Sequence, residues 1–174
     1  MLTELVVLFT RDLDKLLTEL AAYPSEESLW TVQGDISNSA GNLALHLIGN
    51  LSQFIGDDLG QVRYARDREA EFSRRGVPRS ELLQGVRQVQ ELVQKTLGGL
   101  DASRLDQVHP RTPPGPGFPS DMTSGSFLLH LYGHLNYHLG QINYHRRLLG
   151  LQEDPSSAGQ SGTLILPPSL TSGR

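Results

Sequence analysis

Histidine is the residue type in this chain whose spacing points most directly to chemistry. Four of the six histidines, His130, His134, His138 and His145, fall within one predicted helix, residues 123–149. A helix turns about 100° per residue, so residues four apart stack one turn above another. The four rings therefore share an arc of roughly 80° on the helical wheel, at the edge of the apolar face.

A row of imidazoles at the edge of a core has to satisfy its ring nitrogens. Each buried ring carries two of them, and neighbouring rings repel one another when protonated. A shared metal ion removes both difficulties, because neutral imidazole is a good ligand. His134 and His138 can bind one ion together, and His46, beside the apolar stripe of another predicted helix, is the best histidine donor for a third position. Hydrogen-bonded core histidines or a surface pair remain alternatives.

Three further side chains are candidates to support such an ion. Asn50 follows His46 by one helical turn, and Gln141 follows His138 by three residues. Either amide could orient a ligand or a metal-bound water, although an ordinary interhelical hydrogen bond is the alternative. His130 lies one turn before His134, where we expect a general base, a supporting donor or a hydrogen-bonded histidine at the helix mouth.

The remaining charged and imidazole groups have simpler expectations. Arg66, Asp67 and Arg68 could anchor an anionic cosubstrate, or form a solvated cluster or a salt bridge between subunits. His109 precedes a proline in a long loop, so we expect it to face solvent. His145 lies near a helix C-terminus, where a partly charged ring suits the helix dipole, and we expect it to act as a cap or a supporting residue.

Two of these segments resemble motifs of the DinB/YfiT-like superfamily. Residues 134–142, His-Leu-Asn-Tyr-His-Leu-Gly-Gln-Ile, resemble its last-helix motif of two histidines four apart followed by Gly-Gln-Ile. Residues 37–47 resemble its second-helix motif, in which a histidine, here His46, supplies the first ligand. Residues 66–72 resemble the charged segment of an uncharacterised branch. The resemblance covers residues 1–150.

The resemblance implies a four-helix bundle of up-down-down-up order that holds a divalent metal with His46, His134 and His138. The implied metal is zinc, nickel, iron or manganese, with zinc or nickel favoured. Homodimers are implied as well, together with, in some branches, thiol S-transferase or isomerase activity that uses a low-molecular-weight thiol. We therefore expect a divalent-metal-dependent enzyme whose partners are a second copy of the chain and a small thiol or electrophile.

Two other classes of function remain open. In one, the chain is a non-catalytic metal-binding or stress-related regulatory bundle. In the other, the bundle binds no metal and its histidines hydrogen-bond one another. Three histidine ligands would leave a position on the ion open, as in catalytic sites. Because the chain has no cysteine, a thiol nucleophile would have to come from a cosubstrate.

Four long helices must position these side chains. Apolar residues at three- and four-residue steps predict helices over residues 2–22, 38–58, 80–97 and 123–149. Ser37 or Asn38 is the expected N-cap of the second helix. Residues 60–76 extend that helix or form a short extra one, and the proline-rich residues 110–120 predict a long surface connection. The predicted fold class is all-α.

Composition limits the domain organisation and the partners. A length of 174 residues fits one domain, a bundle over residues 1–150 followed by a Ser/Gly/Pro-rich tail, 151–174, in which residues 163–166 could dock as an extended piece. The net charge of −4 argues against a nucleic-acid partner. No run reaches the roughly 18 apolar residues that would span a membrane. The N-terminal apolar run lacks signal-peptide features, so we expect a cytoplasmic location.

Overall fold

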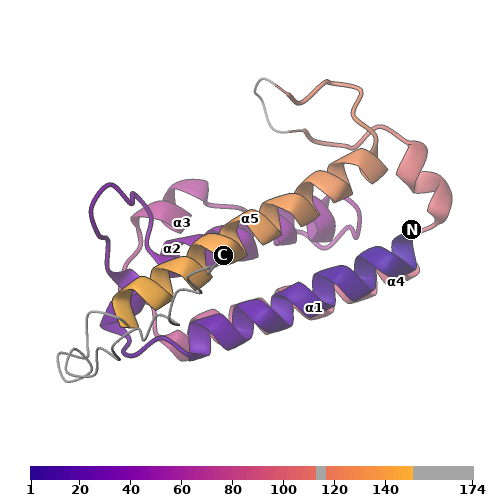
Figure 1. Ribbon diagram of the computed structural model, residues 1–174. Helices are drawn as coiled ribbons and strands as arrows, with labels where there is room; N and C mark the ends of the chain where they lie inside the picture. Colours follow the sequence, from indigo (N-terminus) through magenta and orange to yellow (C-terminus); the bar gives the residue numbers. More distant parts are fainter. Residues whose placement is uncertain (113–116, 151–174) are drawn as a thin grey trace, which may run out of the picture.

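The computed structural model describes residues 1–112 and 117–150 of the chain (Figure 1). These residues form five α-helices: α1 (Leu2–Ala21), α2 (Ala40–Leu51), α3 (Arg68–Ser73), α4 (Arg79–Gly99) and α5 (Ser124–Gly150). Within the same ranges there is no strand, and β pairing is limited to one isolated bridge between Val108 and Thr123. The predicted all-α class is thus confirmed, while the up-down-down-up order stays a prediction.

The helix boundaries follow the apolar periodicity, with two differences in α2, its N-cap and a π-helical turn, and one of the two alternatives for residues 60–76 is now decided. Its N-cap is Ser39 rather than Ser37 or Asn38, because the Ser39 hydroxyl accepts a hydrogen bond from the Asn42 backbone N–H at 3.2 Å. A π-helical turn, Ser52–Asp57, continues α2. The charged residues after it do not lengthen α2 but form the short extra helix α3. The predicted tail, with residues 163–166, lies outside the described residues.

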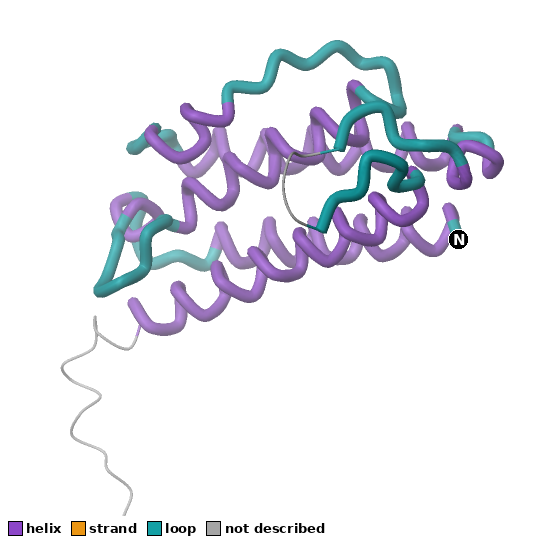
Figure 2. The backbone as a smooth tube through the Cα atoms, turned by 90° about the horizontal axis from the view of Figure 1, so that it is seen from above, coloured by secondary structure: helices purple, strands orange, loops and turns teal. Residues whose placement is uncertain are grey.

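The long helices pack against one another through apolar faces and run side by side (Figure 2). α1 contacts α4 and α5, and α2 contacts the same two helices as well as α3. Each long helix supplies fully buried side chains to one core, among them Phe9, Leu47, Leu82 and Phe127. Two elements far apart in sequence, α2 and α5, are thereby held together. None of the described helices is both long and apolar enough to cross a membrane.

The π-helical turn Ser52–Asp57 brings α2 close to α4. A Cβ atom at Gly56 would lie 2.5 Å from Leu92 Cδ2, so a larger residue at this position would require the Leu92 side chain to move. π-helical turns inside α-helices occur frequently at functional sites. Here the turn follows the histidine of α2 by less than two helical turns and carries Gln53 and Phe54, which line a cavity described below.

A buried carboxylate ties α1 to α5. Asp12 is fully buried and is held by Arg11 Nε at 2.8 Å, Lys15 Nζ at 2.9 Å and the Tyr132 hydroxyl at 2.7 Å. The hydrogen bonds from Arg11 lower the pKa of Asp12 far below its usual range, against the opposing effect of burial, and Lys15 and Tyr132 lower it further. The carboxylate is therefore ionised throughout the physiological range.

We expect Asp12→Asn to lower the free energy of unfolding at pH 7 by about 1.5–3 kcal/mol, the usual worth of hydrogen bonds to a charged group. The folded-state pKa lies below the unfolded value of about 3.9. The carboxylate therefore stabilises the fold above that pH and stops doing so as the pH falls. Urea unfolding at pH 7 and near pH 2.5 should show the difference from wild type shrinking in acid. The exposed Asp35→Asn is the control, and an equal loss in both variants would contradict the assignment.

Candidate metal centre

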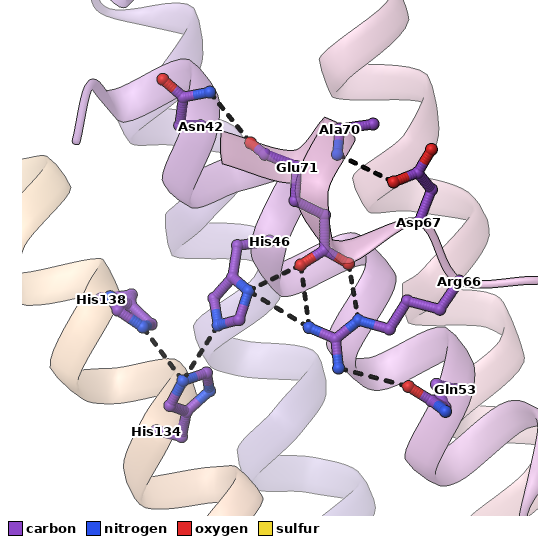
Figure 3. Close-up of polar contacts among 9 residues, drawn as sticks. All are labelled: Asn42, His46, Gln53, Arg66, Asp67, Ala70, Glu71, His134 and His138. Carbon is purple, nitrogen blue, oxygen red and sulfur yellow. Dashed lines mark hydrogen bonds and ion pairs between the residues drawn. The ribbon is translucent and has the colours of Figure 1, made fainter. Parts of the chain in front are cut away.

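Three histidines from two helices converge at one point (Figure 3). His46 comes from α2, and His134 and His138 come from successive turns of α5. His134 Nε2 lies 3.2 Å from His46 Nε2 and 3.0 Å from His138 Nε2. One ring nitrogen of each residue lies within 4.8 Å of the other two. The structure therefore brings together the three histidines that the sequence singled out.

The partners of the outer nitrogens fix the tautomer of two rings. His46 Nδ1 lies 2.8 Å from Glu71 Oε2, and His138 Nδ1 lies 2.7 Å from Gln141 Oε1. Both oxygens are acceptors, so each Nδ1 carries a proton and each Nε2 presents a lone pair. Arg66 Nη2 also lies 3.2 Å from His46 Nδ1, but a guanidinium only donates, and it donates to Glu71 at 2.8 Å.

The inner nitrogens cannot all satisfy one another without a cation. His46 and His138 both direct a lone pair at His134 Nε2, and a single proton on that nitrogen can serve only one of them. A cation between the three nitrogens serves all of them at once. Neutral imidazoles with a hydrogen-bonded Nδ1–H form the usual histidine arrangement around zinc and similar ions. The donor set thus fits one divalent metal ion.

Burial keeps His134 and His138 in the neutral form that a metal requires. It lowers the pKa of His134 to about 3, and the adjacent imidazoles of His138 and His46 add to the effect. Burial also lowers the pKa of His138, although the hydrogen bond to Gln141 opposes the shift. At neutral pH these two rings are therefore uncharged, so a metal ion would not have to compete with the second ring proton of an imidazolium.

Glu71, on α3, is the carboxylate that supports His46. Its side chain is buried, and Arg66 clamps it with two hydrogen bonds, Nε to Oε1 at 2.6 Å and Nη2 to Oε2 at 2.8 Å. Burial alone raises the pKa of Glu71, but the hydrogen bonds from Arg66 and His46 outweigh it and leave the pKa below its ordinary value. The carboxylate is therefore ionised and can orient the His46 ring.

The backbone of α2 is shaped to receive Glu71. A Cβ atom at Gly49 would lie 2.1 Å from Glu71 Oε1, so any side chain there would displace the carboxylate. Asn42 fixes the neighbouring helix, because its Nδ2 donates to the backbone carbonyls of Glu71 at 2.9 Å and Arg74 at 3.0 Å. Asp67 caps α3 by accepting from the Ala70 backbone N–H at 2.9 Å. The charged segment is thus a fixed wall of the site.

The three expected supporting residues take different places. Gln141 contacts a candidate ligand directly, through His138 Nδ1. Asn50 is buried one turn beyond His46, and its Oδ1 has no hydrogen-bond partner among the described residues. His130 does not join the cluster but lies one turn from it, its ring centroid 6.0 Å from that of His134 and 4.7 Å from that of Phe118.

Two histidines depart from expectation. His109 was expected to face solvent, but it is buried against the ring of Phe127, with centroids 4.4 Å apart, and burial lowers its pKa to about 4. His145 is also buried, and burial lowers its pKa, so it is not a charged group at the end of α5. Its Nδ1 forms a hydrogen bond of 2.8 Å with the Tyr23 hydroxyl, which ties the loop after α1 to α5.

One side of the cluster opens onto a cavity of about 910 Å³. His46 and His134 lie in its wall together with Asn50, His130 and Arg66. Three histidine ligands do not complete the coordination of a zinc-like ion, and such open positions distinguish catalytic from structural sites. A small molecule in this cavity would therefore be placed beside the ion.

The carboxylate Glu71 had no role in the sequence-based interpretation, although it lies in the charged segment noted there. It is 25 residues from His46, and only the fold brings the two together.

Comparison with known proteins agrees with the geometry. The sequence profile of the DinB superfamily matches residues 8–142, whereas searches of curated proteins and of solved structures found no match. The match spans most of the chain, and the chain therefore belongs to the DinB superfamily.

Proposed function

We propose that the chain is a metal-dependent enzyme that binds one divalent ion with His46, His134 and His138. The observation that carries the proposal is the convergence of three Nε2 atoms, two of which have tautomers fixed by Glu71 and Gln141. Membership of the DinB superfamily, whose members are metal-associated, supports it. Among the metals that imidazole ligands suit, we favour zinc or nickel.

The proposed reaction is transfer of a low-molecular-weight thiol to an electrophile. When bound, a divalent ion would supply Lewis acidity and lower the pKa of a thiol or water at its open position. The chain would provide the remaining functions: Glu71 and Gln141 orient two ligands, and His130 lies on the cavity wall where it could accept a proton. Because the chain contains no cysteine, the thiol must be a cosubstrate. The proposal includes a cytoplasmic location, where such thiols stay reduced.

We expect His138→Ala to abolish metal binding and thiol transfer together, because two imidazoles remain where three held the ion. The affinity for zinc should fall by more than the 10- to 100-fold typical of losing a supporting residue. His130→Ala should keep the metal and, if its ring handles a proton, should slow turnover. Zinc per chain in protein without a histidine tag, and thiol consumption with several electrophiles, are the two measurements.

The two readouts separate the competing interpretations. Loss of zinc in His130→Ala with retention in His138→Ala would refute the assigned ligands. Bound zinc without turnover of any thiol and electrophile would favour a non-catalytic metal-binding or regulatory bundle. No zinc in the wild-type protein would favour histidines that only hydrogen-bond one another.

A second expected outcome concerns the support of His46. Glu71→Gln should weaken zinc binding by about 10- to 100-fold, because the neutral amide loses the charge that polarises the His46 ring. Glu69→Gln removes the same charge from an exposed position of the same helix and should leave the affinity unchanged. Competition with a chromophoric chelator measures both. Equal weakening in the two variants would indicate a general electrostatic effect and no specific role for Glu71.

The proposal also includes a homodimer formed through the outer face of α5. Leu129, Tyr137 and Tyr144 are large exposed apolar or aromatic side chains on this helix, at 54%, 65% and 68% exposure. Gly133 and Gly140 lie between them, and no atom lies within 4 Å of a Cβ built at either position. On the helical wheel the five positions share an arc of roughly 80°. A second copy could approach closely along this stripe.

The double substitution Tyr137→Glu with Tyr144→Glu should convert a dimer into a monomer, because it places carboxylates in an interface that would bury both rings. Light scattering across a concentration series measures the mass. Val7→Glu, at an exposed position of α1, should leave the dimer intact. A wild-type protein that is monomeric at every concentration would end this part of the proposal without affecting the metal centre.

A further inference from the structure

The cavity beside the three histidines has an uneven charge distribution. Three arginines, Arg66, Arg68 and Arg111, line it, and among the residues that the structure describes no aspartate or glutamate does. Arg66 is neutralised by its two hydrogen bonds to Glu71, and Arg111 by ion pairs with Asp57 and Asp58. The positive charge available to a ligand therefore depends on the third arginine.

Arg68 has no acidic partner among the described residues. Its guanidinium lies over the ring of Phe72, 5.3 Å from the centroid, and the Phe72 ring in turn packs against His46 with centroids 4.9 Å apart. The aromatic contact holds the charge at the rim of the cavity without cancelling it. Glu71 and Arg66 compensate each other, so a divalent ion on three neutral imidazoles would add further positive charge to the same space.

The rest of the wall indicates the shape and polarity of a ligand. Asn50 lines the cavity and is 7% exposed, and its buried Oδ1 has no hydrogen-bond partner among the described residues. Phe54 and Phe118 supply aromatic surface, and the Phe118 ring meets His130 edge-on at 90° with centroids 4.7 Å apart. The cavity therefore combines the unpaired positive charge of Arg68, the buried amide of Asn50 and the aromatic surface of Phe54 and Phe118.

We infer that this cavity binds a small organic carboxylate with a planar apolar body, and that Arg68 receives its carboxylate. A guanidinium matches a carboxylate in a paired hydrogen-bond geometry. The aromatic wall holds the body of the ligand, and the field of the ion favours the negative charge. As the substrate class of the proposed enzyme, the inference rests on the proposed function, although the contact with Arg68 can be measured separately.

The test measures binding of benzoate to the zinc-loaded full chain by titration calorimetry. Benzamide has the same shape without the charge, and inorganic phosphate has charge without the ring. We expect benzoate to bind at least about tenfold more tightly than either. Arg68→Gln should remove the preference over benzamide, whereas Arg63→Gln, which removes the same charge from an exposed position of the same segment, should retain it. Melting temperature and zinc content establish that each variant is folded and loaded.

Several results would overturn the inference. Equal weakening in Arg63→Gln and Arg68→Gln would show a diffuse field instead of a contact. Equal binding of benzamide would show that charge is not recognised, and equal binding of phosphate would exclude a role for the apolar wall. Stoichiometric zinc without benzoate binding would refute the carboxylate site and leave the metal centre in place. Benzoate binding that depends on Arg68 in a chain that takes up no zinc would instead refute the proposed enzyme.

Discussion

Two imidazole nitrogens, of His46 and His138, lie 3.2 Å and 3.0 Å from the Nε2 atom of His134, and the surrounding structure holds the three rings in this arrangement. Lone pairs at that separation repel unless a proton or a cation lies between them. Holding the rings in place therefore requires support on their outer sides, which Glu71 provides for His46 and Gln141 provides for His138. A buried carboxylate needs a partner of its own, because an unpaired buried charge is costly. Arg66 is that partner. A continuous series of contacts therefore runs outward from His46 to Glu71 and from Glu71 to Arg66.

The helices contribute to this chain of contacts as much as the polar residues do. Gly49 leaves the space that the Glu71 carboxylate occupies. Asn42 donates a hydrogen bond to the backbone of α3 and so holds the short helix against α2. A helix of six residues is too short to be stable alone. Its conformation depends on α2, and the orientation of His46 on α2 depends in turn on α3. The local structure and the candidate site therefore stabilise each other.

The choice of His46 as the third ligand rested on its place beside an apolar stripe and on the family resemblance, whereas the long helices and the pair His134 and His138 were predicted from the apolar periodicity and the histidine spacing. Both signals are local, since they arise from residues a few positions apart on one helix. Glu71 could not be found in this way, because its contact with His46 depends on how the segment after α2 folds back. His109 was misjudged for a related reason: proline-rich composition indicates a surface loop, yet the His109 ring at the start of that loop turns inward onto Phe127.

Arg66 and Arg68 are two positions apart in the sequence, but their side chains make different contacts. Arg66 precedes the cap of α3 and turns toward Glu71, where its charge is compensated. Arg68 begins the helix and lies on Phe72, where its charge is retained. Arg66 stabilises the ionised carboxylate of Glu71. Arg68 adds a positive charge to the cavity, which the neutral pair of Arg66 and Glu71 does not. In the proposed enzyme, separating the two charges would let one short segment support a candidate metal ligand through Arg66 and Glu71 and present a free positive charge to a substrate through Arg68.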